Sequence, residues 1–180
     1  MADFTRSYPA LLKAEGGYVL TNTKGDRGGQ TYAGISRRWH PDWEGWKHES
    51  VMSTPGSTTQ LRALVSDFYR KNFWNPILGD QIKDQGVAEA IFLMGVLSGL
   101  KTTGVATQQT VNGLVLDGVL SEDGIIGKRT IAELNRVKPE LFLPWFSLRQ
   151  IKYYVGVARK PAQLQFLRGW VNRVLNAVGV

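Results

Sequence analysis

The feature that most constrains the fold is an apolar run from Val87 to Leu100, which only Glu89 and Ser98 interrupt. The run is shorter than the roughly 18 residues that a membrane-spanning helix requires. We therefore interpret it as a helix buried in a protein core. A chain of 180 residues can build a sizeable core around such a helix, either as one domain or as one lobe with a small appendage.

The spacing of the other apolar residues predicts a mainly α fold. Prolines and glycines mark where the helices end, and a Gly-rich stretch over 16–36 predicts a loop or an irregular hairpin that folds back over the end of the first helix. The predicted helices cover residues 7–14, 59–74, 87–100, 128–135, 140–158 and 162–178, with a short helix around Gln108. We expect at most one small β-hairpin.

Glu15 follows the first predicted helix and shares its apolar face. It lies four residues after Leu11 and three after Leu12, so its side chain points toward the core. Burial disfavours the ionised form, and the carbonyl end of a helix that stops at Gly16 and Gly17 adds a partial negative charge. Both effects predict a raised pKa for Glu15, and a carboxyl that keeps its proton near neutral pH can act as a general acid.

Asp26 lies in the Gly-rich stretch, where solvent should keep its carboxylate ionised. Glycosidic cleavage needs a proton donor and a second carboxylate that activates water or attacks directly. Glu15 and Asp26 fit these two roles, and Thr31 could help to hold the water. The alternative is that Glu15 pairs with a neighbouring Lys or Arg and that Asp26 is an ordinary turn former. The residues alone leave both interpretations standing.

Composition limits the possible partners. The chain has no cysteine, which excludes disulfides and thiolate metal sites. Its formal charge of +7 and pI of about 9.8 predict attraction to polyanions such as nucleic acid, anionic lipid or the bacterial cell wall. The spacing of His40 and His48 fits no common metal site, so we expect no metal. The first twenty residues hold no apolar h-region, so we expect no Sec-type signal peptide.

Several motifs resemble glycoside hydrolase family 108, the N-acetylmuramidase family of phage lysozymes and secretion activators. The resemblance spans nearly the whole chain. In the first half it lies in Glu15-Gly-Gly-Tyr18, in Asp26-x-Gly-Gly-x-Thr31-x-x-Gly34-Ile35-Ser36 and in Tyr69-Arg70-x-x-Phe73-Trp74. In the second half, Asp123-Gly124-x-x-Gly127-x-x-Thr130 resembles the signature of a predicted peptidoglycan-binding domain, and Phe166-Leu167-x-Gly169-Trp170-x-x-Arg173 resembles the closing segment of the family.

The resemblance implies a lysozyme-like helical fold and assigns the catalytic glutamate to Glu15. It also implies a water-positioning carboxylate at Asp26 and an assisting hydroxyl at Thr31. We expect Tyr18 and Tyr32 to lie in the cleft, where sugar rings could stack on them. The full set of predicted substrate-binding residues is Gly17, Tyr18, Tyr32, Gly34 and Trp74. Trp74 also fits a core position.

The implied activity is hydrolysis of the β-1,4 bond between N-acetylmuramic acid and N-acetylglucosamine in peptidoglycan, without cofactor or metal. The implied setting is a phage or prophage endolysin, or a secretion activator. The protein would be made in the bacterial cytoplasm and would reach the cell wall through a holin lesion or dedicated export. The implied organisation is a catalytic region over 1–98 and a peptidoglycan-binding or helical completion region over 99–180, packed as one compact unit.

Alternatives remain at this point. One is a lytic transglycosylase, which needs a single acid. Another is a non-catalytic or weakly active wall-binding secretion activator, because Leu93 and Leu97 stand where family members commonly place Asp and Asn. A nucleic-acid binder ranks last, since no recognised nucleic-acid motif is present. The 123–130 motif has its own simple interpretation as a turn leading into a helix, with Thr130 hydrogen-bonded locally.

Overall fold

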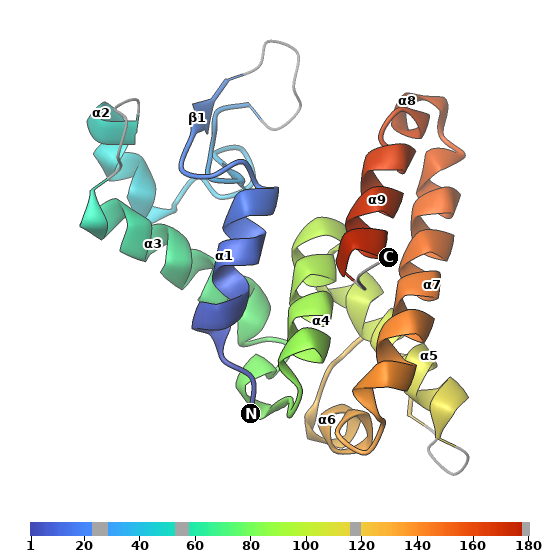
Figure 1. Cartoon of the computed structure of the whole chain (residues 1–180). Coiled ribbons are helices and arrows are strands. Elements are labelled where there is room, and N and C mark those ends of the chain that lie inside the picture. The colour runs from blue at the N-terminus through green and yellow to red at the C-terminus, as the bar shows by residue number, and fades with distance from the viewer. Residues whose placement is uncertain (23–28, 53–57, 116–119, 178–180) are drawn as a thin grey trace. The chain divides into compact units, whose positions relative to one another are not determined.

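The structure, a computed structural model, describes residues 1–22, 29–52, 58–115 and 120–177. It confirms the mainly α prediction, with one small antiparallel sheet (Figure 1). The chain divides into two compact units, Phe4–Asn72 and Phe73–Val180, and Met1–Asp3 belongs to the second. Among the described residues, no helix combines the length and the apolar character needed to cross a membrane.

The unit Phe4–Asn72 combines short helices with the sheet. The strands pair antiparallel in the order β1-β2-β3, with Leu20 opposite Tyr32 and Thr31 opposite Ser36. Thr58 caps the last long helix, because its side chain accepts a hydrogen bond from the Leu61 N–H. The elements are α1 (Phe4–Ala14), β1 (Leu20–Thr21), β2 (Thr31–Tyr32), β3 (Ile35–Ser36), the 3₁₀ turn Glu44–His48, α2 (Glu49–Met52) and α3 (Thr59–Tyr69), which continues as the π-helical turn Arg70–Trp74.

The unit Phe73–Val180 is built around the apolar run predicted to be buried. Ile91 and Phe92 of this run are fully buried, and its helix packs against α5 and α7, while α7 packs against α9. Phe142 and Phe146 stack within α7 at a centroid distance of 5.2 Å. The helices are α4 (Gln85–Ser98), α5 (Leu100–Leu114), α6 (Lys128–Leu134), α7 (Pro139–Ala158), α8 (Pro161–Leu164) and α9 (Leu167–Ala177), with a 3₁₀ turn at Gly79–Gln81.

Helix α5 is longer than the short helix predicted around Gln108. Thr103, Thr107 and Thr110 interrupt its apolar pattern, and β-branched residues lower helix propensity. In the structure all three are buried, and each hydroxyl donates a hydrogen bond of 2.7–3.0 Å to the carbonyl four residues earlier. Tertiary packing and these local hydrogen bonds therefore stabilise a helix that propensity alone does not predict.

The 123–130 motif forms the turn that leads into α6, as predicted. The Gln108 side-chain amide donates to Asp123 Oδ1 and accepts from the Gly124 N–H, both at 2.8 Å. The Thr130 hydroxyl donates to the Ile125 carbonyl at 3.4 Å, which confirms the predicted local bond. The hydrogen bonds from Gln108 and from the Ile125 N–H lower the pKa of Asp123. The polar groups of this motif thus fasten the turn to α5.

Candidate active site

Glu15 is fixed by the way in which α1 ends. The Gly17 N–H donates to the Leu12 carbonyl at 2.8 Å and the Gly16 N–H to the Lys13 carbonyl at 3.3 Å, which is a Schellman motif. Both glycines have positive φ, +83° and +81°. Glu15 is therefore the last residue before the chain reverses, and it is held at the negative end of the helix dipole.

The Glu15 carboxyl lies against the turn between β2 and β3. Ala33 and Gly34 form this turn with φ of +48° and +81°, the signs that a type I′ turn requires. A Cβ at Gly34 would overlap both Glu15 Oε2 and the Tyr69 hydroxyl. The Tyr69 hydroxyl donates to the Ala33 carbonyl at 2.8 Å, which joins α3 to the same turn. Gly34 is therefore the residue that makes room for the carboxyl.

Tyrosines line the neighbourhood of Glu15, which is itself half-buried. Burial raises the pKa of Tyr69, and the negative charge of Glu15 raises it further. The Tyr8 and Tyr18 hydroxyls lie 3.2 Å apart and share a hydrogen bond. Burial is the largest cause of the raised pKa of Tyr8, and this hydrogen bond raises it further. Arg62 stands over the Tyr18 ring at 5.2 Å. Both raised pKa values keep these phenols protonated and neutral at physiological pH.

Of the other two members of the predicted trio, Asp26 and Thr31, the structure describes Thr31 alone. Thr31 is half-buried in β2, and its hydroxyl donates to the Gly29 carbonyl at 3.3 Å. Asp26 lies outside the described residues. The roles of Asp26 and Thr31 therefore stay predictions.

Two of the aromatic residues assigned to substrate binding are core residues. Tyr32 is fully buried and stacks on Trp43 at a centroid distance of 6.3 Å. Trp74 is fully buried in the unit Phe73–Val180, where its indole N–H donates to Asp80 Oδ1 at 2.8 Å and its ring meets Phe92 edge-on. Neither ring is exposed to solvent in this structure, and the substrate-binding roles of Tyr32 and Trp74 stay predictions. Tyr18 is half-buried and stays a candidate.

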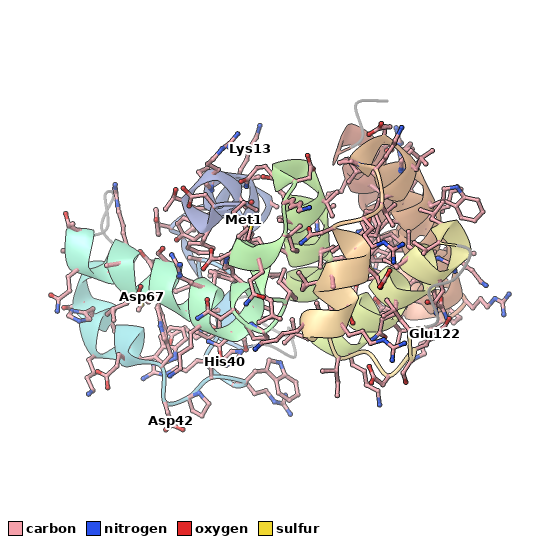
Figure 2. All side chains as sticks on the ribbon, turned by 90° about the horizontal axis from the view of Figure 1, so that it is seen from below. Met1, Lys13, His40, Asp42, Asp67 and Glu122 are labelled. Atoms are coloured by element: carbon pink, nitrogen blue, oxygen red, sulfur yellow. The ribbon has the colours of Figure 1, made fainter. Side chains whose placement is uncertain are left out.

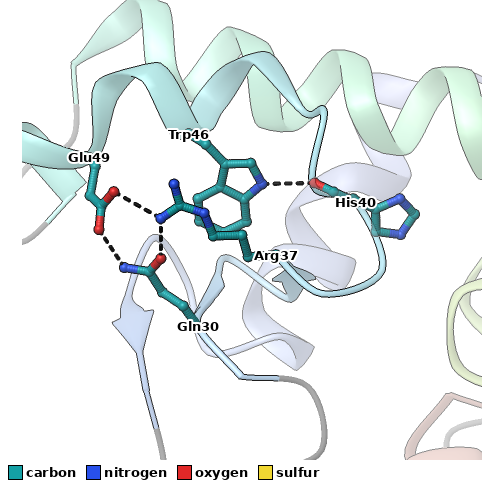
Figure 3. Close-up of polar contacts among 5 residues, drawn as sticks. All are labelled: Gln30, Arg37, His40, Trp46 and Glu49. Carbon is teal, nitrogen blue, oxygen red and sulfur yellow. Dashed lines mark hydrogen bonds and ion pairs between the residues drawn. The ribbon is translucent and has the colours of Figure 1, made fainter.

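A polar network that sequence reasoning missed holds the segments on both sides of the β2–β3 hairpin (Figure 3). The Arg37 guanidinium donates to Gln30 Oε1 at 2.6 Å and to Glu49 Oε2 at 2.9 Å, and the Gln30 amide donates to Glu49 Oε1 at 2.8 Å. Hydrogen bonds from Gln30 and Arg37 lower the pKa of Glu49. Arg37 also covers the Trp46 ring, whose N–H donates to the His40 carbonyl. These residues follow no regular spacing that could have revealed them.

The same unit carries an open groove of about 420 Å³ that sequence reasoning also missed. Trp39 is 66% exposed there, and Figure 2 labels His40, Asp42 and Asp67 of the lining. The His40 ring meets Phe68 edge-on at 4.7 Å, and burial lowers the pKa of His40. The lining does not include Glu15; it consists of Trp39, His40, Pro41, Asp42, Trp43, Glu44, Leu64, Asp67, Phe68, Lys71 and Asn72.

The chemistry of this groove suits a carbohydrate. Indole faces pack against the apolar face of a sugar ring, and exposed carboxylates accept hydrogen bonds from its hydroxyl groups. Within the described part of the chain, no three His, Asp or Glu side chains are grouped so that they could hold a metal ion.

Comparisons with known proteins identify two sequence families in the chain. The sequence model described as "Glycosyl hydrolase 108" matches residues 8–99, and the one described as "Predicted Peptidoglycan domain" matches residues 104–175. The second match supports peptidoglycan as the partner. No curated protein matches the chain.

A solved structure titled "Structure of Brucella abortus SagA" matches with a TM-score of 0.69 and 22% identity, over 97% of this chain and 90% of that one. At this identity the likeness shows the fold alone. The first sequence match spans just over half of the chain and contains Glu15, Thr31 and Gly34. The protein is therefore a member of the glycosyl hydrolase 108 family.

Proposed function

We propose that the protein is an N-acetylmuramidase that hydrolyses the β-1,4 bond between N-acetylmuramic acid and N-acetylglucosamine in peptidoglycan. The family membership and the peptidoglycan match support a peptidoglycan-acting glycosyl hydrolase. The observation that carries the proposal is the position of Glu15, whose carboxyl is held at the carbonyl end of α1 against Gly34 and Tyr69. In this proposal Glu15 protonates the leaving glycosidic oxygen.

Two features of the site favour a protonated Glu15 carboxyl. The residue is half-buried, which penalises the charged form. The end of α1 presents the negative pole of the helix dipole to the carboxyl. Glu15 is thus suited to hold a proton until the leaving oxygen takes it.

Asp26 completes the reaction in this proposal by activating water, with Thr31 helping to position that water. Separate tests of Asp26→Asn and Thr31→Ala should each slow hydrolysis. Both variants keep Glu15 as the proton donor. A slower rate in either variant would therefore come from the loss of water activation or water positioning. Wild-type clearing rates for Asp26→Asn would remove Asp26 from the mechanism.

Glu15→Gln tests the proposal directly. The substitution keeps the shape of the side chain but removes the transferable proton, so clearing of purified sacculi should slow by about 100-fold or more. Glu140→Gln is the matched control, because Glu140 is an exposed glutamate in the first turn of α7. Near-UV circular dichroism should show that both variants fold. Equal clearing by Glu15→Gln and wild type would contradict the proposal.

Product analysis separates hydrolysis from transglycosylation. A hydrolase leaves reducing muramic acid ends, whereas a lytic transglycosylase leaves anhydro ends. Mass spectrometry of digested sacculi should therefore show reducing ends only. Anhydro ends would replace the hydrolytic scheme with the single-acid alternative.

A wall-binding protein without activity is the second candidate, suggested by Leu93 and Leu97. Both line a small cavity of about 30 Å³ together with Tyr154 of α7 and Arg173 and Val174 of α9. Leu93 is half-buried, whereas Leu97 is 38% exposed. Sedimentation with sacculi without clearing, in wild type and Glu15→Gln alike, would favour this second candidate. The assignments as endolysin or secretion activator stay predictions.

A further inference from the structure

The C-terminal quarter of the chain is purely basic. Residues 141–180 contain none of the 15 Asp and Glu residues of the protein. The same stretch contains six of its 22 Lys and Arg residues, namely Arg149, Lys152, Arg159, Lys160, Arg168 and Arg173. All six belong to the segment that runs from α7 through α8 to α9, and four of them are exposed. The only carboxylate of this segment is Glu140 in the first turn of α7, so from Leu141 onward the segment presents a positive surface.

Helix α7 adds an exposed apolar stripe to this charge. Six residues recur at alternating spacings of four and three, which places them in one line along a helix. We call this line the α7 outer stripe; it consists of Leu141, Trp145, Leu148, Lys152, Val155 and Arg159. Its four apolar members are 45–62% exposed. The opposite face of α7 is buried through Phe142, Phe146, Gln150 and Tyr154, so the stripe is not needed for the core.

A groove of about 430 Å³ borders the stripe and has the same chemical character. Arg149, Lys152 and Lys160 supply three cations, and Lys152 also belongs to the stripe. The floor is largely apolar, with Val105 and Val157 among its residues, and no acidic side chain lines the groove. Stripe and groove together form one surface that is apolar and cationic.

We propose that the α7 outer stripe and this groove dock the protein on the surface of an anionic lipid bilayer. Leucine and tryptophan side chains bury their apolar parts at the boundary between headgroups and acyl chains, while Lys and Arg reach the anionic headgroups. A second copy of the chain fits this surface poorly, because it would bring together two sets of four cations, Arg149, Lys152, Arg159 and Lys160. The binding is peripheral and does not depend on glycan hydrolysis.

Vesicle sedimentation of the full-length protein tests the proposal. Large vesicles of phosphatidylethanolamine and phosphatidylglycerol (3:1) should bind the protein at least about tenfold more tightly than phosphatidylcholine vesicles, because each cation near an anionic surface contributes to binding. Raising NaCl from 0.1 to 0.5 M should weaken the binding to the anionic vesicles several-fold. Equal binding to both lipids would overturn the proposal.

Leu148→Glu locates the docking surface, and Ile125→Glu is its matched control. Both residues are exposed aliphatic side chains, 62% and 70% respectively, and both substitutions add one negative charge, but Ile125 lies outside the stripe. We expect Leu148→Glu to weaken vesicle binding by about tenfold or more and Ile125→Glu to change it by less than about threefold. Equal effects of the two substitutions would overturn the proposal.

Two further measurements exclude other occupants of the surface. Sedimentation with lipid-free sacculi should be unchanged in Leu148→Glu. A loss of sacculus binding with intact vesicle binding would assign the stripe to peptidoglycan instead. Analytical ultracentrifugation should show a monomer in both proteins, and a dimer that Leu148→Glu dissociates would assign the stripe to a second copy. A wild-type melting temperature for Leu148→Glu verifies that the variant is folded.

Discussion

Gly34 is the residue on which the geometry around Glu15 most directly depends. Its φ of +81° disfavours any side chain, and a Cβ there would also overlap Glu15 Oε2 and the Tyr69 hydroxyl. Gly34→Ala should lower the free energy of unfolding by about 2–4 kcal/mol, from strain and overpacking together. It should also slow wall clearing by about tenfold or more, since the carboxyl must move. Urea denaturation and turbidity assays measure the two effects.

Gly29→Ala separates these two causes. Gly29 also has a positive φ, +63°, but a Cβ there meets nothing within 4 Å. Its substitution should cost about 1 kcal/mol from backbone strain alone and leave clearing close to wild type. If both variants lost activity equally, backbone strain in the hairpin would explain the loss, and the special role of Gly34 beside Glu15 would be wrong.

At the scale of elements, the contact between α5 and the 123–130 turn rests on Gly104. A Cβ at Gly104 would overlap the carbonyl group of Gly124, which is backbone and cannot rotate away. Gly104→Ala should therefore lower the free energy of unfolding by about 1–3 kcal/mol. Gly113 lies in the same helix, and a Cβ there would make only an ordinary contact at 3.5 Å. Gly113→Ala should therefore raise the free energy of unfolding by about 0.5–1 kcal/mol. Urea denaturation that gave both variants the same stability would contradict this account.

The helices could be predicted where apolar spacing and end signals agree. The run from Val87 to Leu100 predicted α4 but not its end, because α4 stops at Ser98 and Leu100 already begins α5. The glycines at 16 and 17 marked the end of α1, so Glu15 could be placed on the helix face in advance. Helix α5 could not be delimited in the same way, because buried threonines interrupt its pattern. The final predicted helix is divided into α8 and α9.

The rest of the site depends on contacts that no local pattern encodes. Tyr32 sits in a strand of two residues, too short to show which side chain faces inward, so its burial against Trp43 could not be predicted. The network of Gln30, Arg37 and Glu49 forms only because the segment after β3 folds back beside the hairpin. Such residues become visible only when the fold is known.

At the scale of the whole molecule, the sequence family and the packing divide the chain at different places. The glycosyl hydrolase match extends to residue 99, whereas the first compact unit ends at Asn72. Residues 73–99 therefore belong by sequence to the hydrolase but pack with the C-terminal helices. The predicted division at residues 98 and 99 stays a prediction, and truncation at this point tests it.

A chain ending at residue 99 would keep every family motif of the first half but lose the partners of α4. Helix α4 packs against α5 and α7, and Ile91, Phe92 and Met94 are buried. Full exposure of such a side chain costs about 1.5–3 kcal/mol. The cost for all three side chains together approaches the whole free energy of unfolding of a small domain. We expect the 1–99 protein to bind the dye ANS, to unfold without a cooperative transition and to clear no sacculi, with the full-length protein as the control. A cooperative transition together with wall clearing by 1–99 would instead show that the C-terminal helices are dispensable for the fold of the catalytic half.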